Sequence, residues 1–391
     1  MNVYPWQDLL SKINPDEVVK VVQDMVRLKS INPPGLEKRM SEYVKNYMIS
    51  KNIPTETLEF ATDRYNVISR LKGKGEENPI IFTGHMDVVP VSKDEEKRWQ
   101  TDPFGGEIFD GNLHGRDSSD MKAGLGAAMV AMGYLAENGI VPPGDIILVA
   151  TVDEEALMGG AKSIIKTDVI ADAKNVVVCE PTGMELVTCC RGRTWADITV
   201  KGLTAHASQK GAGINAIDRT LMLMNKMAGY EIPHQEHPYL GTSFWQITVI
   251  KGGVEPAIVP DRCTITVDAR LVPGQMPQDI WNLMEQLIAE IKEEVPDFEA
   301  EIEILDQREP WVTPADDPMI QKIKGAYEVL SMPYRENGFS GTTDGTIFRR
   351  IGMEAVIIGP GDLACVHKEN EKVSLEQLAQ AVQLYLITML I

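Results

Sequence analysis

Apolar and polar residues follow one pattern up to about Trp195, another up to about Pro310, and the first again after it. In the first part, short runs rich in Val, Ile and Leu stand between longer stretches with apolar residues at helical spacing. Short, continuously apolar runs are typical of parallel strands buried on both faces, so this part predicts an α/β core. Its strands are expected at Tyr65–Leu71, Ile80–Thr83, Asp145–Val152 and Asn175–Glu180, and its helices at Val18–Ser30, Leu36–Met48 and Lys122–Asn138.

The middle part predicts a different unit. Its expected elements have the order β-α-β-β-α-β, which is that of a ferredoxin-like unit. They are Trp195–Gly202, Asn215–Tyr230, Ser243–Gly252, Cys263–Val272, Gln278–Val295 and Glu299–Leu305. The α/β pattern then returns, with a helix at Asp317–Leu330, a strand at Ala355–Gly359 and a helix at Ser374–Leu390. A length of 391 residues suits two domains. We therefore predict one discontinuous α/β domain, residues 1–190 and 304–391, and one inserted domain, residues 191–303.

Composition narrows the classes of function. The chain has 38 basic and 57 acidic residues, a net charge of -19, which argues against nucleic acid as a partner. Neither a signal peptide pattern nor a membrane-length apolar run is visible, so we expect a cytoplasmic protein without a membrane partner. The five cysteines form no CxxC pair, which argues against a disulfide framework and a thiolate zinc site. A metal ion, if bound, should be held by histidines and carboxylates.

Polar residues fall at the ends of the predicted strands. In open α/β sheets, sites lie outside the carboxyl ends of the strands, so these residues are expected to converge. They are His85 and Asp87 after PIIFTG, Glu154 and Glu155 after DIILVATV, Glu180 after NVVVC, and His367 after AVIIGPGDLAC.

The resulting donor set indicates which ions would bind. Two histidines and three carboxylates suit divalent zinc, cobalt or manganese. The set is too large for one tetrahedral ion and right for two ions, typically ~3.5–4 Å apart, that share a carboxylate. Its members are His85, Asp120, Glu155, Glu180 and His367. Because side chains at i and i+2 share a face in extended backbone, Asp87 can orient the His85 ring.

Six segments of the chain form a set of motifs: GHMDVVP, LHGRDSSDMKAGLGAAM, VDEEALMGGA, CEPT, TAHAS and GPGDLACVHKENEKVS. Together they resemble the M20 metallopeptidases, a family that contains acetylornithine deacetylase, succinyl-diaminopimelate desuccinylase, aminoacylase and glutamate carboxypeptidase. The resemblance runs from about Val19 to Ile391. It implies a metallopeptidase-type catalytic domain with a mostly parallel sheet. It also implies that the inserted ferredoxin-like domain serves dimerisation, in a homodimer.

The resemblance further implies roles for single residues. His85 and Glu180 would bind one metal ion, Glu155 and His367 the other, and Asp120 would bridge them. Glu154 would be the general base, and the Asp120–Met121 bond would be cis. Arg191, Arg270 and Thr342 would bind substrate, the arginines by holding a carboxylate. His206 would reach the partner subunit's site and stabilise an oxyanion.

Departures from the family pattern leave the ligands intact but leave the substrate open. They are Asp117 and Ala123, where glycines are usual, and Ala257, Ser340 and Thr346. We expect hydrolysis of an amide in a small N-acyl amino acid, as in a deacetylase or desuccinylase. The alternatives are a dipeptidase or carboxypeptidase acting on a short peptide, and a non-catalytic binding protein on the same fold.

Ordinary structural roles compete with each of these assignments. Glu154 and Glu155 could be a solvated acidic pair, and Asp120 could be the N-cap of the helix that follows it. Arg191 and Arg270 could form surface ion pairs. His206 could be a surface histidine.

Overall fold

The computed structural model describes residues 6–233 and 236–391, and the chain divides into two compact units. The larger unit comprises the chain up to Thr188 together with Thr313–Asn337 and Thr343–Ile391. The smaller unit comprises Cys189–Val312 and Gly338–Thr342. In the described residues, no helix combines the length and apolarity needed to cross a membrane.

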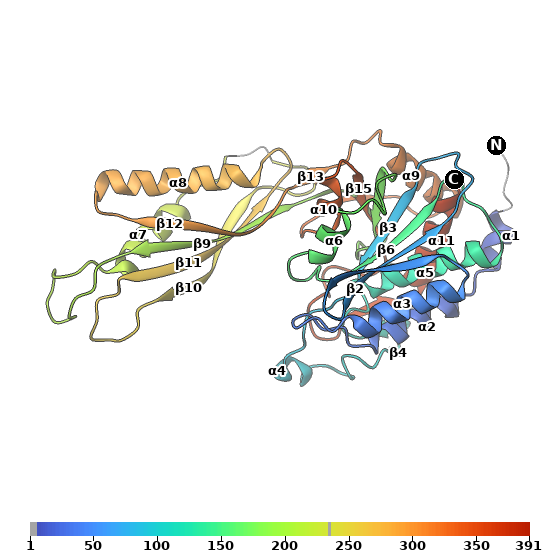
Figure 1. Ribbon diagram of the computed structural model, residues 1–391, viewed down its shortest axis with the longest axis horizontal. Helices are drawn as coiled ribbons and strands as arrows, with labels where there is room; N and C mark the ends of the chain where they lie inside the picture. The colour runs from blue at the N-terminus through green and yellow to red at the C-terminus, as the bar shows by residue number, and fades with distance from the viewer. Residues whose placement is uncertain (1–5, 234–235) are drawn as a thin grey trace. The chain divides into compact units, whose positions relative to one another are not determined.

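The larger unit is built on a mixed sheet with a parallel centre (Figure 1). The strand order is β1-β2-β6-β3-β7-β15-β8, and β6, β3, β7 and β15 are mutually parallel. This confirms the predicted fold class. The strands are β1 (Thr55–Ala61), β2 (Arg64–Leu71), β3 (Ile80–His85), β6 (Ile146–Thr151), β7 (Asn175–Val178), β8 (Leu186–Cys190) and β15 (Glu354–Ile357).

The central strands are buried on both faces, as their sequences predicted. Every residue of β3 and of β6 is buried. On one face, Ile80 and Phe82 join a core with α2, α3, α5, α9 and α11, while α6 and α10 also contact the sheet. The helices are α1 (Trp6–Ser11), α2 (Pro15–Val26), α3 (Lys38–Ser50), α4 (Lys93–Glu96), α5 (Lys122–Glu137), α6 (Gly159–Ile164), α9 (Pro318–Leu330), α10 (Gly345–Arg349) and α11 (Leu375–Leu390).

Short strands complete the architecture. A small sheet has the order β16-β5-β4, with β4 (Glu107–Phe109), β5 (Asn112–His114) and β16 (Lys372–Ser374). It joins the segment that follows His367 to the segment that precedes Asp120, because β16 pairs with β5. Two more short strands, β13 (Trp311–Val312) and β14 (Glu336–Phe339), each pair with β8 and belong to the same sheet as β3 and β6.

The smaller unit has the predicted ferredoxin-like order of elements. Its antiparallel sheet runs β10-β11-β9-β12. Alternate residues such as Ile198 and Val267 form a core with α7 and α8, including the buried Trp281. The elements are β9 (Gly192–Lys201), α7 (Ala216–Ala228), β10 (Phe244–Gly252), β11 (Arg262–Leu271), α8 (Pro277–Glu294) and β12 (Ala300–Arg308).

Candidate metal centre

The polar residues predicted at strand ends occupy one edge of the parallel sheet. Apolar strand residues are buried in the core, and the chain becomes polar where each strand leaves it. His85 is the last residue of β3, Glu154 and Glu155 follow β6, Glu180 follows β7, and His367 follows β15. The fold thus brings together candidate ligands from four separate segments of the sequence.

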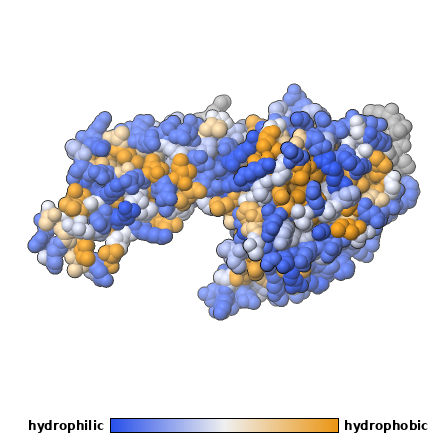
Figure 2. Space-filling view, viewed as in Figure 1, coloured by the Kyte–Doolittle hydropathy of each residue, from blue (hydrophilic) through white to orange (hydrophobic). Residues whose placement is uncertain are grey.

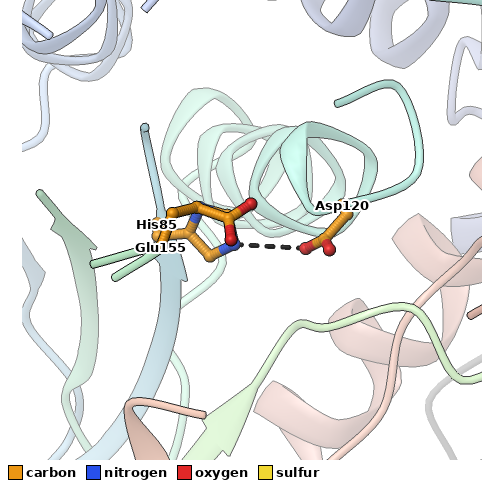
Figure 3. A group of neighbouring side chains, drawn as sticks. All are labelled: His85, Asp120 and Glu155. Carbon is orange, nitrogen blue, oxygen red and sulfur yellow. Dashed lines mark hydrogen bonds and ion pairs between the residues drawn. The ribbon is translucent and has the colours of Figure 1, made fainter. Parts of the chain in front are cut away.

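Asp120 lies between the two histidines. Its Oδ1 is 3.2 Å from Nε2 of His85, and its Oδ2 is 3.2 Å from Nε2 of His367. Figure 3 shows the first of these contacts, with Glu155 beside it. The Asp120–Met121 bond is cis, as the resemblance implied. Helix α5 begins at Lys122 with Met121 as its N-cap, so Asp120 is not the helix cap.

Each histidine also has a glutamate beside it. Oε1 of Glu155 is 2.9 Å from Nε2 of His367, and Oε1 of Glu180 is 3.7 Å from Nε2 of His85. Ligand atoms of His85, Asp120 and Glu155 all lie within 4.8 Å of one another. The donors therefore form two groups of one histidine and one glutamate, with one oxygen of Asp120 facing each.

The His85 ring is oriented by a main-chain carbonyl. Its Nδ1 lies 2.8 Å from the carbonyl oxygen of Asp87, whereas the nearest Asp87 carboxylate oxygen is 3.9 Å away. A carbonyl only accepts, so Nδ1 carries the proton of a neutral ring and the Nε2 lone pair is available as a ligand. The Asp87 carboxylate instead accepts from the backbone N–H groups of Glu154, at 3.1 Å, and Glu155, at 3.2 Å. Asp87 thus links the histidine to the two glutamates.

Charge in the site is dominated by carboxylates. Burial, with the charge of Asp120, raises the pKa of Glu180 well above its usual value, and burial raises the pKa of Glu155. Burial also opposes ionisation of Asp120, but hydrogen bonds from His367 and His85 outweigh it and hold the pKa of Asp120 well below its usual range.

The histidines respond to the same carboxylates. Hydrogen bonds to Asp120 and Glu155 raise the pKa of His367 to about 10. Burial lowers the pKa of His85, but the hydrogen bond to Asp120 and the charge of Glu180 outweigh it and raise the pKa well above its usual value. The raised pKa values of these histidines and glutamates mean that the site attracts positive charge. Nitrogen and carboxylate donors in this arrangement fit a pair of borderline divalent cations.

Comparison with protein-family models identifies the family to which the chain belongs. Residues 81–390 match the model of peptidase family M20/M25/M40. The chain belongs to this family. It is 24% identical over 406 residues to a probable succinyl-diaminopimelate desuccinylase of Staphylococcus epidermidis, an alignment that covers 96% of this chain and 98% of that one.

Solved structures share the fold. An aminopeptidase PepT from Bacillus cereus is 22% identical with a TM-score of 0.76, over 96% of this chain and 98% of that one. A dinuclear metal-binding M20 peptidase of Bacillus subtilis is 14% identical with a TM-score of 0.73, over 98% of each chain. This M20 protein is a metal-binding hydrolase of amide or peptide C–N bonds.

The residues predicted to bind substrate all lie in the smaller unit. Arg191 is buried and donates to the backbone carbonyls of Thr242, at 2.7 Å, and Leu240, so it is not a surface ion-pair partner. Arg270 is partly buried and holds Asp268 through two hydrogen bonds of 2.8 and 2.9 Å. Thr342 Oγ1 accepts a 2.9 Å hydrogen bond from Arg308.

His206 is exposed on the smaller unit, and its tautomer is set by a neighbour. The backbone N–H of Ser208 donates to Nδ1 of His206 at 3.2 Å, and the Ser208 hydroxyl lies 2.8 Å from the same atom. Nδ1 is therefore an acceptor, and the proton of the neutral ring is on Nε2. A donor at Nε2 is the chemical form that an oxyanion requires.

Sequence reasoning missed the residues that support Asp87. The buried Asn32 donates to the Asp87 carboxylate at 2.8 Å and to Asp153 at 3.3 Å. Asp153 in turn pairs with Arg64 at 2.9 Å. Asp153 has a left-handed φ of 67°, immediately before Glu154. The sequence signal was an asparagine before two prolines, which by itself predicts only a turn.

One departure from the family pattern is also explained. Asp117, at a position where glycine is usual, has a φ of 65°, a conformation that Asp adopts more readily than most residues. Its side chain is buried and forms an ion pair with Lys122, which also donates to the Met25 carbonyl at 2.9 Å. Burial raises the pKa of Asp117 to about 7.

Proposed function

We propose that this M20 protein hydrolyses the amide bond of a small N-acyl amino acid with two divalent cations, as a deacetylase or desuccinylase does. The observation that carries this proposal is the division of the Asp120 carboxylate, whose two oxygens each lie 3.2 Å from a different histidine. His85 and Glu180 would hold one cation, Glu155 and His367 the other, and Asp120 would bridge them. When bound, such cations polarise the scissile carbonyl and acidify a water molecule.

The chain's own residues would then move protons. Glu154 is buried beside the donor set, and its charge acts on both His85 and Glu180. Its carboxylate accepts a proton from the attacking water and returns one to the amide nitrogen as the C–N bond breaks. The Nε2 proton of His206 is the donor for the developing oxyanion in the partner subunit. Arg191, Arg270 and Thr342 would form the substrate side of the smaller unit.

A homodimer through the smaller unit is part of the proposal. Strand β10 lies at one edge of the sheet and exposes Val249 and Ile250, by 40% and 54%. It contains a single charged residue, Lys251, whereas the opposite edge strand β12 carries Glu301 and Glu303. Figure 2 shows apolar side chains at the surface of the smaller unit among hydrophilic ones. Charged residues protect an edge from pairing, so β10 is the edge suited to a second copy.

The substrate class is tested with chelated protein to which zinc, cobalt or manganese is added. N-acetyl and N-succinyl amino acids are compared with dipeptides as substrates. Chelated protein to which no metal ion is added serves as the blank. We expect metal-dependent turnover that is fastest on an N-acyl amino acid, in line with the desuccinylase relative. Turnover of dipeptides alone would replace this proposal with a dipeptidase, the second candidate. Chelated protein that is as active as metal-loaded protein would refute the metal-dependent mechanism.

A further inference from the structure

Glu371 joins two loops of the proposed metal centre. It lies four residues after His367 and immediately before β16. Its side chain is fully buried, and its Oε1 accepts hydrogen bonds from the backbone N–H groups of Ser119, at 3.0 Å, and Asp120, at 3.1 Å. The segment that supplies one ligand, His367, therefore also holds the main chain of another, Asp120.

The second carboxylate oxygen of Glu371 is held by an arginine. Arg116 Nη1 donates to Oε2 of Glu371 and to the carbonyl of Lys368, both at 3.1 Å. Arg116 is 1% exposed, and its guanidinium forms an ion pair with Glu95 of α4 and lies over the Trp99 ring, 5.4 Å from its centroid. Burial raises the pKa of Glu371 to about 8, and the charge of Arg116 opposes that rise.

This arrangement is more specific than a buried ion pair requires. An ion pair needs only Arg116 and one carboxylate, but Glu371 also gathers two consecutive amides next to Asp120. An aspartate side chain has only two rotatable bonds, so fixing its main chain largely fixes where its oxygens can lie. A small displacement of that main chain would move both oxygens of Asp120 away from the two histidines that they face.

We infer that Glu371 is a positioning residue, which with Arg116 holds the Asp120 and His367 loops so that Asp120 can serve two cations. This inference rests on the two-metal function proposed above. Partners that orient metal ligands typically change metal affinity by ~10–100-fold when they are replaced. Because Asp120 faces both histidines, replacing Glu371 should weaken both cations together.

The test is Glu371→Gln, with Glu369→Gln as its matched control. The glutamine side chain keeps the shape of the glutamate, but its NH₂ group must face either Arg116 or the backbone N–H groups of Ser119 and Asp120, which are all donors. Glu369 is in the same segment, exposed, and 3.6 Å from Arg98. Zinc affinity and stoichiometry are measured on chelated full-length protein by competition with a chromophoric chelator. We expect ~10–100-fold weaker binding at both sites for Glu371→Gln and an unchanged affinity for the control.

Two further variants separate positioning from general stability. Val382, on α11, belongs to the hydrophobic core of the larger unit. Val382→Ala removes methyl groups from this core and should lower the melting temperature without changing zinc affinity. Arg116→Lys keeps a positive charge but loses the planar guanidinium that contacts both Glu95 and Glu371. If Glu371→Gln does not fold, Arg116→Lys takes its place as the test. Wild-type zinc affinity in the folded variant overturns the inference. Wild-type protein that binds no zinc, cobalt or manganese refutes the proposed function instead.

Discussion

The two units of the chain use opposite kinds of strand, and this difference decides where chemistry can be read from sequence. In the larger unit, β3 and β6 are buried at every position, so polar residues are left to the strand ends. In the smaller unit, β9 and β11 alternate, and polar residues line a whole face of the sheet. Polar residues that can only stand at strand ends converge on one edge of the sheet.

The smaller unit shows the consequence of alternation. Arg270, Arg193 and Arg308 lie directly opposite one another across β11, β9 and β12. Like charges in register are unfavourable, and Asp306 offsets them through contacts of 2.5 Å with Arg193 and 2.9 Å with Arg308. Arginines in such a row have structural reasons to be present, so their number and spacing do not single out one that binds substrate.

The largest expected effect tests the larger unit. Glu154→Gln should lower turnover by ~10²–10⁴-fold while the bound metal remains, because an amide cannot accept the proton but has nearly the same shape. Metal content by elemental analysis and turnover of the best substrate are measured on the same preparation. Activity within a few fold of wild type would mean that another residue is the base. Loss of metal would make Glu154, rather than Glu155, a ligand.

The second prediction tests whether the smaller unit contributes to catalysis. His206→Ala should lower turnover by ~10²–10³-fold, the usual effect of removing one oxyanion donor. If His206 acts across a dimer, mixing His206→Ala with Glu154→Gln under subunit exchange should restore part of the activity. Each mixed dimer would then contain one site with both groups. Verified exchange without recovery would place His206 in its own subunit's reaction, and near-normal activity of His206→Ala would remove it from catalysis.

The sequence singled out candidate site residues at the strand ends, but it did not single out the residues that form hydrogen bonds with them. His85, Glu155 and Glu180 follow continuous apolar runs, so the local pattern of a buried strand indicates them. Asn32 and Glu371 act through hydrogen bonds to residues 55 and 251 positions away along the chain. No periodicity encodes such contacts. The sequence predicted that the Asp87 side chain orients the His85 ring, but the structure corrects this: the backbone carbonyl of Asp87 makes the close contact, and its carboxylate lies 3.9 Å away.

The third prediction compares the two edges of the smaller unit's sheet. Ile250→Lys on β10 should weaken the proposed homodimer on the order of 10–100-fold, because the new ammonium would be buried without a partner. Ile304→Lys is the matched control, since Ile304 is exposed by 45% on the opposite edge strand, β12. Sedimentation velocity across a dilution series measures both. A shift to monomer in the control alone would assign the interface to β12, and equal behaviour of both variants would remove the edges from the interface.

The smallest effect contrasts the two ends of β6, where Asp145 stands before the strand and Glu154 after it. Asp145 accepts hydrogen bonds from Lys72 at 2.8 Å, Gly73 at 2.9 Å and Arg70 at 3.0 Å. Burial raises its pKa, but these donors outweigh burial and lower the pKa below its usual value. A carboxylate with a lowered folded-state pKa stabilises the fold above its unfolded pKa of ~3.9, and this stabilisation is lost as pH falls through the folded-state pKa.

Asp145→Asn should therefore reduce the free energy of unfolding at pH 7 by about 1–3 kcal/mol. The difference from wild type should shrink once the pH falls below ~4. Urea titrations across this range measure it, with turnover at pH 7 followed in parallel. Because Asp145 is at the amino end of β6, turnover of the folded variant should equal that of wild type. A variant that loses turnover while its stability is unchanged would show that function is not confined to the carboxyl ends of the strands.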